Sequence, residues 1–461
     1  MSAPDNAAAI AAAVAAGRLT ATAAVEAALA RIAALDPGVN AFTDVTAERA
    51  RARAAALDAH ITAGKAPGPL AGVPFAVKNL FDVEGLATRA GSKINRERAP
   101  AARDGALVRR LEAAGAVLVG ALNMGEYAYD FTGENAHDGP SRNPHDRERM
   151  SGGSSGGSGA AVAAGLVPLA LGSDTNGSIR VPSAFCGTFG LKPTFGRLSR
   201  AGSFPFVASF DHLGALARSV ADLALAYDAM QGADPDDPWQ TPRPVEPVSE
   251  ALAQGTTGLR IAVAGGYFAR GGEQDCFAAV ARAAEAVGAT SGVEIPEAAR
   301  ARAAAFVITA SEAAGLHLDR LRECPGDYDP AVRDRLIAGT TIPAAWVHRA
   351  QRFRSWYRAR VLALFDEVDV ILAPCTPCRA LRLGQTTMEL DGVTVPARPN
   401  IGVFTQPISF IGLPVVAVPV RVGGGLPLAV QVIAAPWRED LALRVAGAIE
   451  AAGVGAAPVA G

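Results

Sequence analysis

The chain has 461 residues, of which half are hydrophobic and 19% are charged, and its mean hydropathy is +0.20. This much apolar material excludes an intrinsically disordered protein. The 43 basic and 45 acidic residues leave a net charge of −2, so neither a nucleic-acid partner nor an anionic membrane partner is expected. Five scattered cysteines form an odd-numbered set, which predicts a reducing, cytoplasmic location rather than a disulfide framework.

The expected elements begin with two or three helices across residues 5–60, the first in the Ala-rich stretch 7–17. No basic residue precedes that stretch, which favours an ordinary helix over a signal peptide. Strands are expected at 73–78, 116–119, 167–171, 259–265, 368–373, 414–420 and 427–433, and helical segments at 105–115, 159–165, 275–365 and 438–452. Strands interleaved with helices predict an α/β fold with a largely buried sheet.

Three segments invite other interpretations. Residues 234–256 are typical of a linker or surface loop. The stretch 401–420 has no charge and is long enough to span a bilayer, but its three prolines favour a buried loop followed by a strand, so a soluble protein is expected. Cys375 and Cys378 have CxxC spacing, yet no second CxxC or nearby His supports a metal or redox site, and a turn after strand 368–373 is the favoured reading.

The segment most informative for function is 151–182, which holds two glycine-serine clusters separated by an apolar helix and a strand. Such elements do not normally follow a flexible linker, and a phosphate-binding loop needs GK[ST] or a GxGxxG after a strand. A nucleophile elbow at Ser155 needs a strand directly before it, where the sequence has the polar run RNPHDRERM. The two clusters are therefore better interpreted together.

Three residues associated with these clusters have the chemistry of a catalytic unit. Ser154 lies in the first cluster and Ser178 in the second, while Lys78 ends the upstream apolar run VPFAVK. Burial disfavours a charged ammonium, and neutralising Lys78 at pH 7 needs its pKa lowered by ~3.4 units, which costs about 4.6 kcal/mol. For Lys78 alone, a strand-end lysine that reaches solvent remains the alternative.

Nearly the whole chain resembles the amidase signature family. The matching landmarks, in the family's order, are LAGVPFAVKN (70–79), LNMGEYAY (122–129), RNP (142–144), GGSSGGS (152–158), GSDTNGSIRVPS (172–183), GLKPTFGRLS (190–199) and LPLAVQ (426–431). The resemblance implies an α/β fold in which residues 1–461 form one domain, with a single mixed β-sheet covered by helices on both faces. N-terminal helices would span 5–60, the catalytic core 66–230 with its signature segment 151–182, and the remaining strands and substrate-specificity helices 258–455.

The resemblance also implies a Ser-Ser-Lys triad. Lys78 would be the general base, Ser154, following a cis peptide bond, the proton relay, and Ser178 the acyl nucleophile. Attack on an amide carbonyl also needs an oxyanion site, which the backbone N–H groups of 175–178 are placed to supply. The other residues expected to bind the oxyanion or substrate are Thr175, Asn176, Gly177, Gly153, Arg180 and His317. This chemistry requires no metal or other cofactor.

Two of these residues have open roles. Arg180 could clamp a substrate carboxylate with two hydrogen bonds, but the family motif has Arg here even where substrates are neutral, so a structural ion pair is slightly favoured. His317 lies in the helical half, where the family's specificity residues vary, although a lone histidine is more often a surface or satisfied residue.

Departures from the common pattern refine the resemblance. Asn176 stands where Gly is common, Ala429 replaces a usual Gly, and Ser409 stands where Asn is frequent. With the segment 308–319 and the loop after residue 400, these features resemble the branch that hydrolyses 1-carboxybiuret in cyanuric acid breakdown. That branch implies ammonia release from a small, anionic, urea-like amide, and a small helical accessory subunit. The Ala-rich N-terminal helices could pack on a second protein surface, which would allow a homodimer and, with the accessory subunit, a heterotetramer. Alternatively, they could cover the chain's own sheet.

The alternatives are an amidotransferase A-type subunit that supplies ammonia to a misacylated tRNA, or an amidase for malonamate, allophanate or biuret. A catalytically silent scaffold that only binds partners is a further alternative, which the intact Lys78, Ser154 and Ser178 disfavour.

Overall fold

The computed structural model describes residues 5–460, which contain one large sheet and two short hairpins. The strands of the large sheet are β1 (Phe42–Val45), β2 (Pro74–Lys78), β3 (Val117–Leu122), β6 (Leu169–Asp174), β7 (Phe189–Lys192), β8 (His212–Ala217), β9 (Ile261–Ala264), β10 (Ser291–Val293), β11 (Val370–Pro374), β14 (Val415–Val420) and β15 (Leu428–Ala434). The hairpins pair β4 (Arg142–Asn143) with β5 (Asp146–Met150), and β12 (Thr387–Leu390) with β13 (Val393–Pro396).

The 11-stranded sheet has the order β1-β3-β2-β6-β8-β7-β14-β15-β11-β9-β10. Strand β2 pairs in parallel with β3 and β6, and β9 in parallel with β10 and β11. The other neighbours are antiparallel, so the sheet is mixed. Strand β2, which ends at Lys78, therefore lies inside the sheet with a partner on each side.

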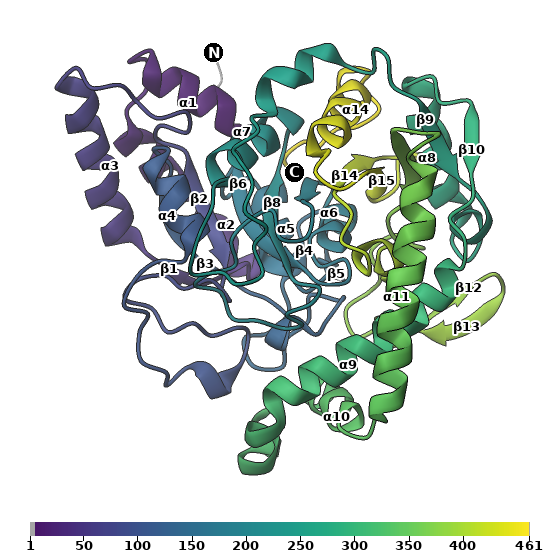
Figure 1. Cartoon of the computed structure of the whole chain (residues 1–461). Coiled ribbons are helices and arrows are strands. Elements are labelled where there is room, and N and C mark those ends of the chain that lie inside the picture. The colour runs from purple at the N-terminus through teal and green to yellow at the C-terminus, as the bar shows by residue number, and fades with distance from the viewer. Residues whose placement is uncertain (1–4, 461) are drawn as a thin grey trace.

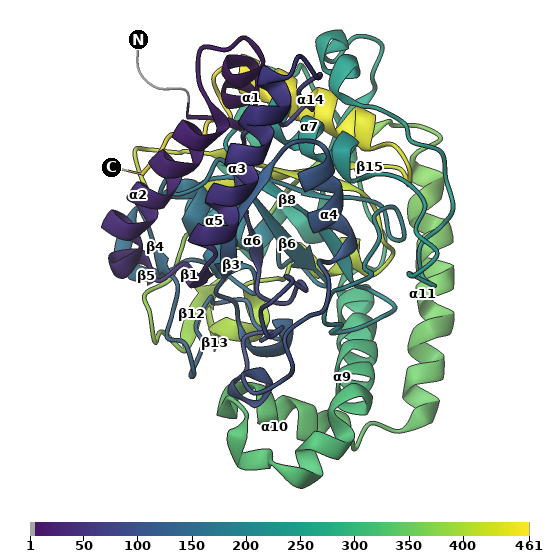
Figure 2. The same ribbon diagram turned by 90° about the vertical axis from the view of Figure 1, so that its left-hand side faces the viewer.

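The helices pack on this sheet and extend beyond it (Figures 1 and 2). They are α1 (Ala7–Ala15), α2 (Ala21–Val39), α3 (Ala47–Thr62), α4 (Ala106–Ala113), α5 (Gly156–Ala163), α6 (Arg180–Cys186), α7 (Val220–Met230), α8 (Gln274–Ala286), α9 (Ala298–Glu323), α10 (Pro330–Gly339), α11 (Ala344–Leu364), α12 (Ala397–Asn400), α13 (Gln406–Ser409) and α14 (Glu439–Ala451). Helix α9 packs against α10 and α11, and this group projects from one end of the molecule in both views.

Alternating side chains of the central strands face two separate cores. Phe75 and Val77 of β2 pack in the core that includes residues of α1, α4, α7 and α14. Ala76, between them, packs in a second core with residues of α2, α3 and α5. Because successive strand side chains point to opposite faces, helices cover both faces of the sheet, and the predicted fold class is confirmed.

Several element boundaries differ from those predicted. Helix α2 continues through Pro37 to Val39 and ends at Asn40, which has a positive φ of 57°. The carboxylate of Asp36, in the last turn of this helix, accepts hydrogen bonds from the N–H groups of Ala41 and Phe42 beyond the helix end. Strands β1, β7, β8 and β10 were not predicted, because they are short or glycine-containing and have no clear two-residue periodicity.

The Ala-rich N-terminal helices use their apolar faces within the chain. Ile10 and Val14 of α1 are buried in the first core, and Val25 and Ile32 of α2 in the second. These helices therefore cover the chain's own sheet. This is the second of the two arrangements that the sequence left open for them.

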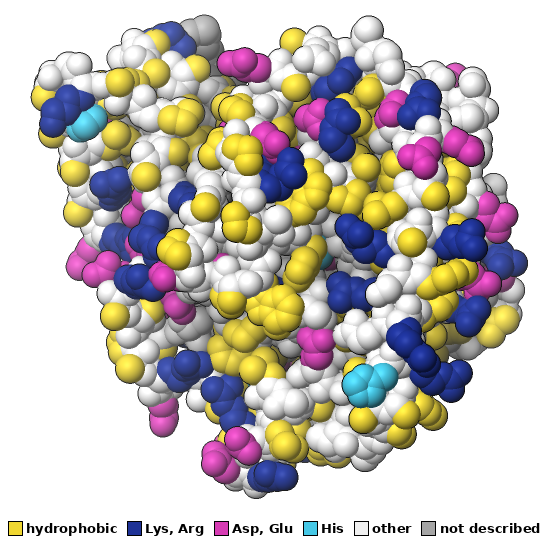
Figure 3. Space-filling model, viewed as in Figure 1, with side chains coloured by type: hydrophobic (Ala, Val, Ile, Leu, Met, Phe, Trp, Pro, Cys, Tyr) yellow, Lys and Arg dark blue, Asp and Glu magenta, His cyan; other side chains and the backbone are white. Residues whose placement is uncertain are grey.

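The uncharged stretch 401–420 forms the predicted buried loop and strand β14, with the short helix α13, which was not predicted, between them. No helix within residues 5–460 is long and apolar enough to cross a membrane. Basic and acidic side chains are interspersed on the face seen in Figure 3, as the small net charge would suggest. The large sheet takes strands from all three predicted segments, 5–60, 66–230 and 258–455, while their union in one domain stays a prediction.

Candidate active site

Lys78 is fully buried at the carboxyl end of β2. Its Nζ lies 2.7 Å from Oγ of Ser154 and 2.9 Å from Oγ of Ser173. Burial lowers the pKa of Lys78 to about 7, against the attraction of nearby carboxylates, of which Asp174 is the strongest. The structure thus excludes a lysine that reaches solvent and places an amine with a pKa near neutrality against two hydroxyl groups.

Ser154 and Ser155 are both buried but have different surroundings. The peptide bond between Gly153 and Ser154 is cis, as the resemblance implies, and Ser154 Oγ lies next to Lys78. Ser155 Oγ donates to the carbonyl of Ser173 at 3.2 Å and accepts from its N–H at 3.3 Å. These backbone contacts give Ser155 a place in the scaffold and leave the nucleophile-elbow reading without support.

Ser178 lies at the end of a glycine-containing loop that leaves β6. The loop lies against the first glycine-serine cluster, because Ser155 N–H donates to the Ser178 carbonyl at 3.3 Å. Gly177 has a φ of 141°, and a Cβ there would meet the side chain of Thr405, so the turn requires glycine. Within residues 5–460, none of the N–H groups of 175–178 has an intramolecular acceptor, as an oxyanion site would require.

The side chains of this loop are held by hydrogen bonds. Thr175 Oγ1 donates to Asp211 at 2.6 Å, and Asn176 Nδ2 donates to Thr309 Oγ1 of α9 at 3.0 Å. The Oδ1 of Asn176 is buried and has no partner in the described chain. Asn176 thus joins the loop to helix α9 and retains a free acceptor beside Ser178.

A small pocket opens onto Ser178, with a free volume of about 30 Å³. Its walls include Asn176, Thr309, Phe306, Arg335, Arg398 and Gln406. Apart from Asn176, these wall residues were not predicted to form the site. They come from α9, α10 and the segment 398–406, and no local sequence motif marks them.

The two arginines of this pocket differ in their partners. Arg398 forms ion pairs with Asp130 and Glu134. Arg335 donates hydrogen bonds to the carbonyls of Ala331 and Tyr129. Its guanidinium carbon also lies 3.9 Å from the centroid of the Tyr129 ring. No carboxylate among residues 5–460 pairs with Arg335, and burial lowers the pKa of its guanidinium. The pocket therefore holds a guanidinium that no carboxylate contacts directly, although Asp130 and Asp329 attract it from nearby.

Arg180 does not reach a substrate, which corrects its place among the predicted substrate-binding residues. It is fully buried and forms a two-fold ion pair with Asp174, at 2.9 and 3.0 Å. Its other N–H groups donate to Ser409 Oγ, Gln431 Oε1 and the Thr405 carbonyl. All five guanidinium donors are thus used within the protein, and the structural ion pair is the correct reading.

His317 also lies outside the substrate-binding site in which the sequence-based prediction placed it. Its ring is buried in an aromatic cluster, 4.2 Å from the Tyr127 centroid, and Nδ1 lies 3.2 Å from the Tyr328 hydroxyl. It is not among the residues around the Ser178 pocket. Burial lowers the pKa of His317 to about 4, so the imidazole is neutral at pH 7. The residue packs helix α9 against the core.

The cysteines of the CxxC are free and buried. Cys375 Sγ donates to the Arg180 carbonyl at 3.3 Å, and Cys378 Sγ lies 3.8 Å from Met388 Sδ. Burial raises the pKa of both thiols. Within residues 5–460, no three His, Cys, Asp or Glu side chains come together as metal ligands.

The mixed sheet, the family landmarks and the Lys78–Ser154 pair define an amidase-type hydrolase. A model of the Amidase family matches residues 23–443, so the chain belongs to this family. It is 56% identical over 443 residues to AtzE, a 1-carboxybiuret hydrolase subunit of Pseudomonas sp. (strain ADP), covering 96% of this chain and 97% of that protein. The A-type subunit of the glutamyl-tRNA(Gln) amidotransferase of Roseiflexus castenholzii (strain DSM 13941 / HLO8) is 38% identical over 466 residues, covering 94% and 93%.

A solved structure described as an unexpected vestigial protein complex, which reveals the origins of an s-triazine catabolic enzyme, superposes on this chain with a TM-score of 0.97. It is 55% identical in sequence, and the match covers 98% of this chain and 99% of that one. A bacterial aryl acylamidase of the amidase signature family superposes with a TM-score of 0.89 at 28% identity, covering 97% and 96%. The chain is an amidase signature hydrolase.

Proposed function

We propose that this chain hydrolyses 1-carboxybiuret to urea-1,3-dicarboxylate and ammonia, with Lys78, Ser154 and Ser178 as its catalytic triad. The observation that carries the substrate class is the guanidinium of Arg335, which forms no direct ion pair among the described residues and shares a pocket with Ser178. A substrate carboxylate would neutralise it through charge-assisted hydrogen bonds. The relative with 56% identity, which belongs to a 1-carboxybiuret hydrolase, supports this particular anionic amide.

Acylation follows from the chemistry of the three side chains. Neutral Lys78 accepts the proton of Ser154, and Ser154 accepts that of Ser178, whose Oγ attacks the terminal amide carbon. The free N–H groups of 175–178 stabilise the resulting oxyanion, and one such donor is typically worth about 2.7–4 kcal/mol. The proton then passes back through Ser154 to the departing ammonia, which leaves an ester on Ser178. Gly153 supports this arrangement by carrying the peptide that precedes Ser154.

The test is ammonia release from 1-carboxybiuret, biuret, allophanate, malonamate and glutamine, without tRNA. We expect 1-carboxybiuret to give the highest kcat/KM. The variant Arg335→Met should raise KM for the anionic amides about tenfold to a hundredfold, because a hydrogen bond to a charged group contributes about 1.5–3 kcal/mol. Arg333→Met on the same helix is the control, since Arg333 pairs with Asp334 outside the pocket. Preference for glutamine would instead favour the amidotransferase role.

We propose further that the chain works in the cytoplasm with a small helical accessory subunit, as a heterotetramer containing two copies of this chain. Support for a partner comes from the vestigial complex and from the relative's designation as a subunit. Trp346 and Trp356 of α11 are 56% and 42% exposed, and exposed tryptophans are enriched at protein interfaces. The mass in solution, measured for the chain alone and after co-expression with a candidate small helical subunit, tests this; a fully active, stable monomer would contradict it.

A further inference from the structure

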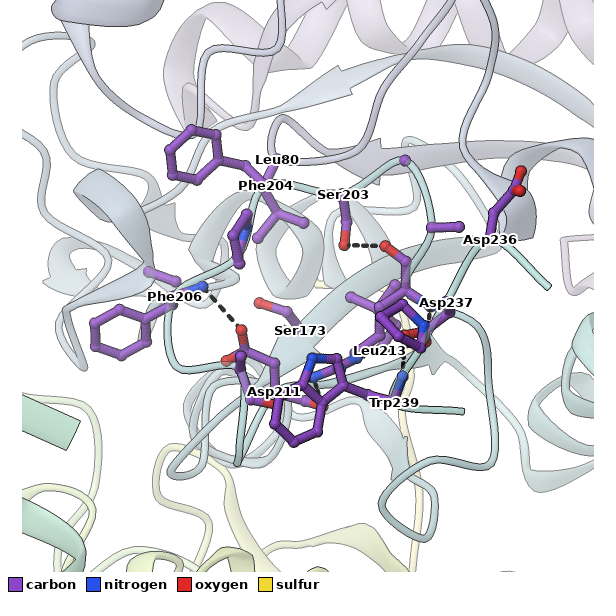
Figure 4. Close-up of a pocket in the computed structure, with 17 residues that line it drawn as sticks. Leu80, Ser173, Ser203, Phe204, Phe206, Asp211, Leu213, Asp236, Asp237 and Trp239 are labelled. Atoms are coloured by element: carbon purple, nitrogen blue, oxygen red, sulfur yellow. Dashed lines mark hydrogen bonds and ion pairs between the residues drawn. The ribbon is translucent and has the colours of Figure 1, made fainter. Parts of the chain in front are cut away.

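A second cavity, distinct from the Ser178 pocket, lies close to Lys78. It has a volume of about 350 Å³, and Ser173 forms part of its wall. Ser173 Oγ lies 2.9 Å from Nζ of Lys78. Because Lys78 itself is fully buried, Ser173 forms a polar link between the lysine and this cavity. Figure 4 shows Ser173 among the lining residues Leu80, Phe206 and Asp211.

The cavity runs from the surface to the interior. Two of its lining residues reach the surface: Trp239 is 49% exposed, and Asp236 is also exposed. At its inner end, Ser173 and Leu213 are only 5% and 3% exposed. The carboxylate of Asp211 and the hydroxyl of Ser203 give the walls polar groups, which a site that holds water requires.

The same cavity adjoins the Ser178 pocket. Ala128 and Phe206 line both spaces, so the two are neighbours across these side chains. The free volume of the Ser178 pocket is about 30 Å³, whereas one water needs roughly 10–15 Å³ when measured in this way. An acyl group bonded to Ser178 would occupy most of that small space, so a second route would let water reach the acyl carbon.

We propose that the second cavity delivers the water that hydrolyses the acyl-enzyme. The water oxygen forms a bond to the acyl carbon, and its proton passes through Ser154 to Lys78. The bond from that carbon to Ser178 Oγ then breaks, and Oγ takes the proton back from the relay, so one water is consumed and one carboxylic acid is released. This inference rests on the triad and on the proposed hydrolysis.

Filling the cavity tests the inference. Ala208 and Ala201 line it, are partly exposed, and have no part in the triad or the Ser178 pocket. The variants are Ala208→Trp and Ala201→Phe, so that one remains if the other fails to fold. The control is Ala56→Trp, which adds the same side chain at an exposed position of α3, away from both cavities and from α11. Circular dichroism and thermal melting verify the fold of each variant.

With 1-carboxybiuret, acid-quenched time courses of the filled variants should show a burst of about one ammonia per active site. The steady rate should then fall at least tenfold, and intact-protein mass spectrometry should find an acyl adduct on Ser178. An unchanged steady rate in a folded filled variant, or a slower rate without an adduct, would overturn the water route. Failure of the wild type to release ammonia would refute the proposed substrate instead, and the same comparison would then use an amide from the panel that the wild type hydrolyses.

Discussion

The buried amine of Lys78 should leave a measurable signature in the stability of the protein. Its pKa drops from 10.5 to about 7 on folding, chiefly through burial. Below pH 7 the lysine is protonated in both the folded and unfolded states, and the folded state bears the full cost of the buried charge. Between pH 7 and 10.5 only the unfolded lysine binds the proton, so this residue's contribution to stability rises with pH.

The size of this contribution follows from the drop in pKa. At 1.36 kcal/mol per pH unit, a drop from 10.5 to about 7 corresponds to about 5 kcal/mol. The variant Lys78→Met removes the titration. It also leaves the Ser154 and Ser173 hydroxyls without their amine partner, at a cost of about 1–3 kcal/mol each that does not depend on pH in this range. The wild type minus variant difference should therefore be flat below pH 7 and rise by about 1.4 kcal/mol per pH unit above it.

Urea unfolding followed by circular dichroism from pH 5.5 to 10 measures this difference. Lys65→Met, which removes an exposed lysine, is the matched control and should not reproduce the rise. Groups that titrate in both proteins cancel in the comparison, including Lys192, whose pKa burial also lowers to about 7. A difference that stays constant from pH 7 to 10 would show that Lys78 is charged in the folded enzyme and would refute its role as a neutral base.

Three shorter predictions concern the assigned residues. Ser178→Ala should abolish ammonia release and acyl-adduct formation with the fold intact, while Ser155→Ala should retain the adduct; an adduct on Ser155 would reverse the assignment. Lys78→Arg should be as inactive as Lys78→Ala, because arginine stays protonated and offers no lone pair; substantial kcat in the Arg variant would reduce Lys78 to a source of charge. His317→Phe should keep kcat/KM within about threefold of the wild-type value, because the neutral ring packs away from the pocket. A large loss of kcat would instead show that His317 takes part in the reaction.

The sequence was informative where local chemistry and tertiary structure impose the same requirement. The run ending at Lys78 could be predicted as a strand because the residues before the lysine are all apolar, and the structure buries all five residues of β2. Strands β7 and β8 escaped prediction, since their glycines weaken the pattern and their pairing with each other and with β6 and β14 determines their conformation. Propensity is a weak prior wherever such long-range pairing decides the structure.

The pocket walls were beyond prediction for a related reason. Arg335 and Thr309 lie on different helices, and only the packing of α9 against α10 and of both against the core brings them to Ser178. A helix sequence shows which face is apolar, but it does not show which distant loop that face will meet. The region 258–455 was expected to hold specificity residues, yet His317 was selected from it because of its chemistry, and packing placed that ring elsewhere.

Arg180 shows how a residue next to a nucleophile can serve the site without touching a substrate. Burial would raise the pKa of Asp174, but Arg180 holds that pKa below its usual range, so the pair stays ionised beneath the loop. Ser409 hydrogen bonds to both partners, which gives a structural role to a residue that departs from the common family pattern. The Asp174 carboxylate also accepts from the N–H of Ile179. Strand β6, the start of α6 and the loop between them are therefore fixed together by one buried carboxylate, and the free N–H groups of that loop are held in place before any substrate arrives.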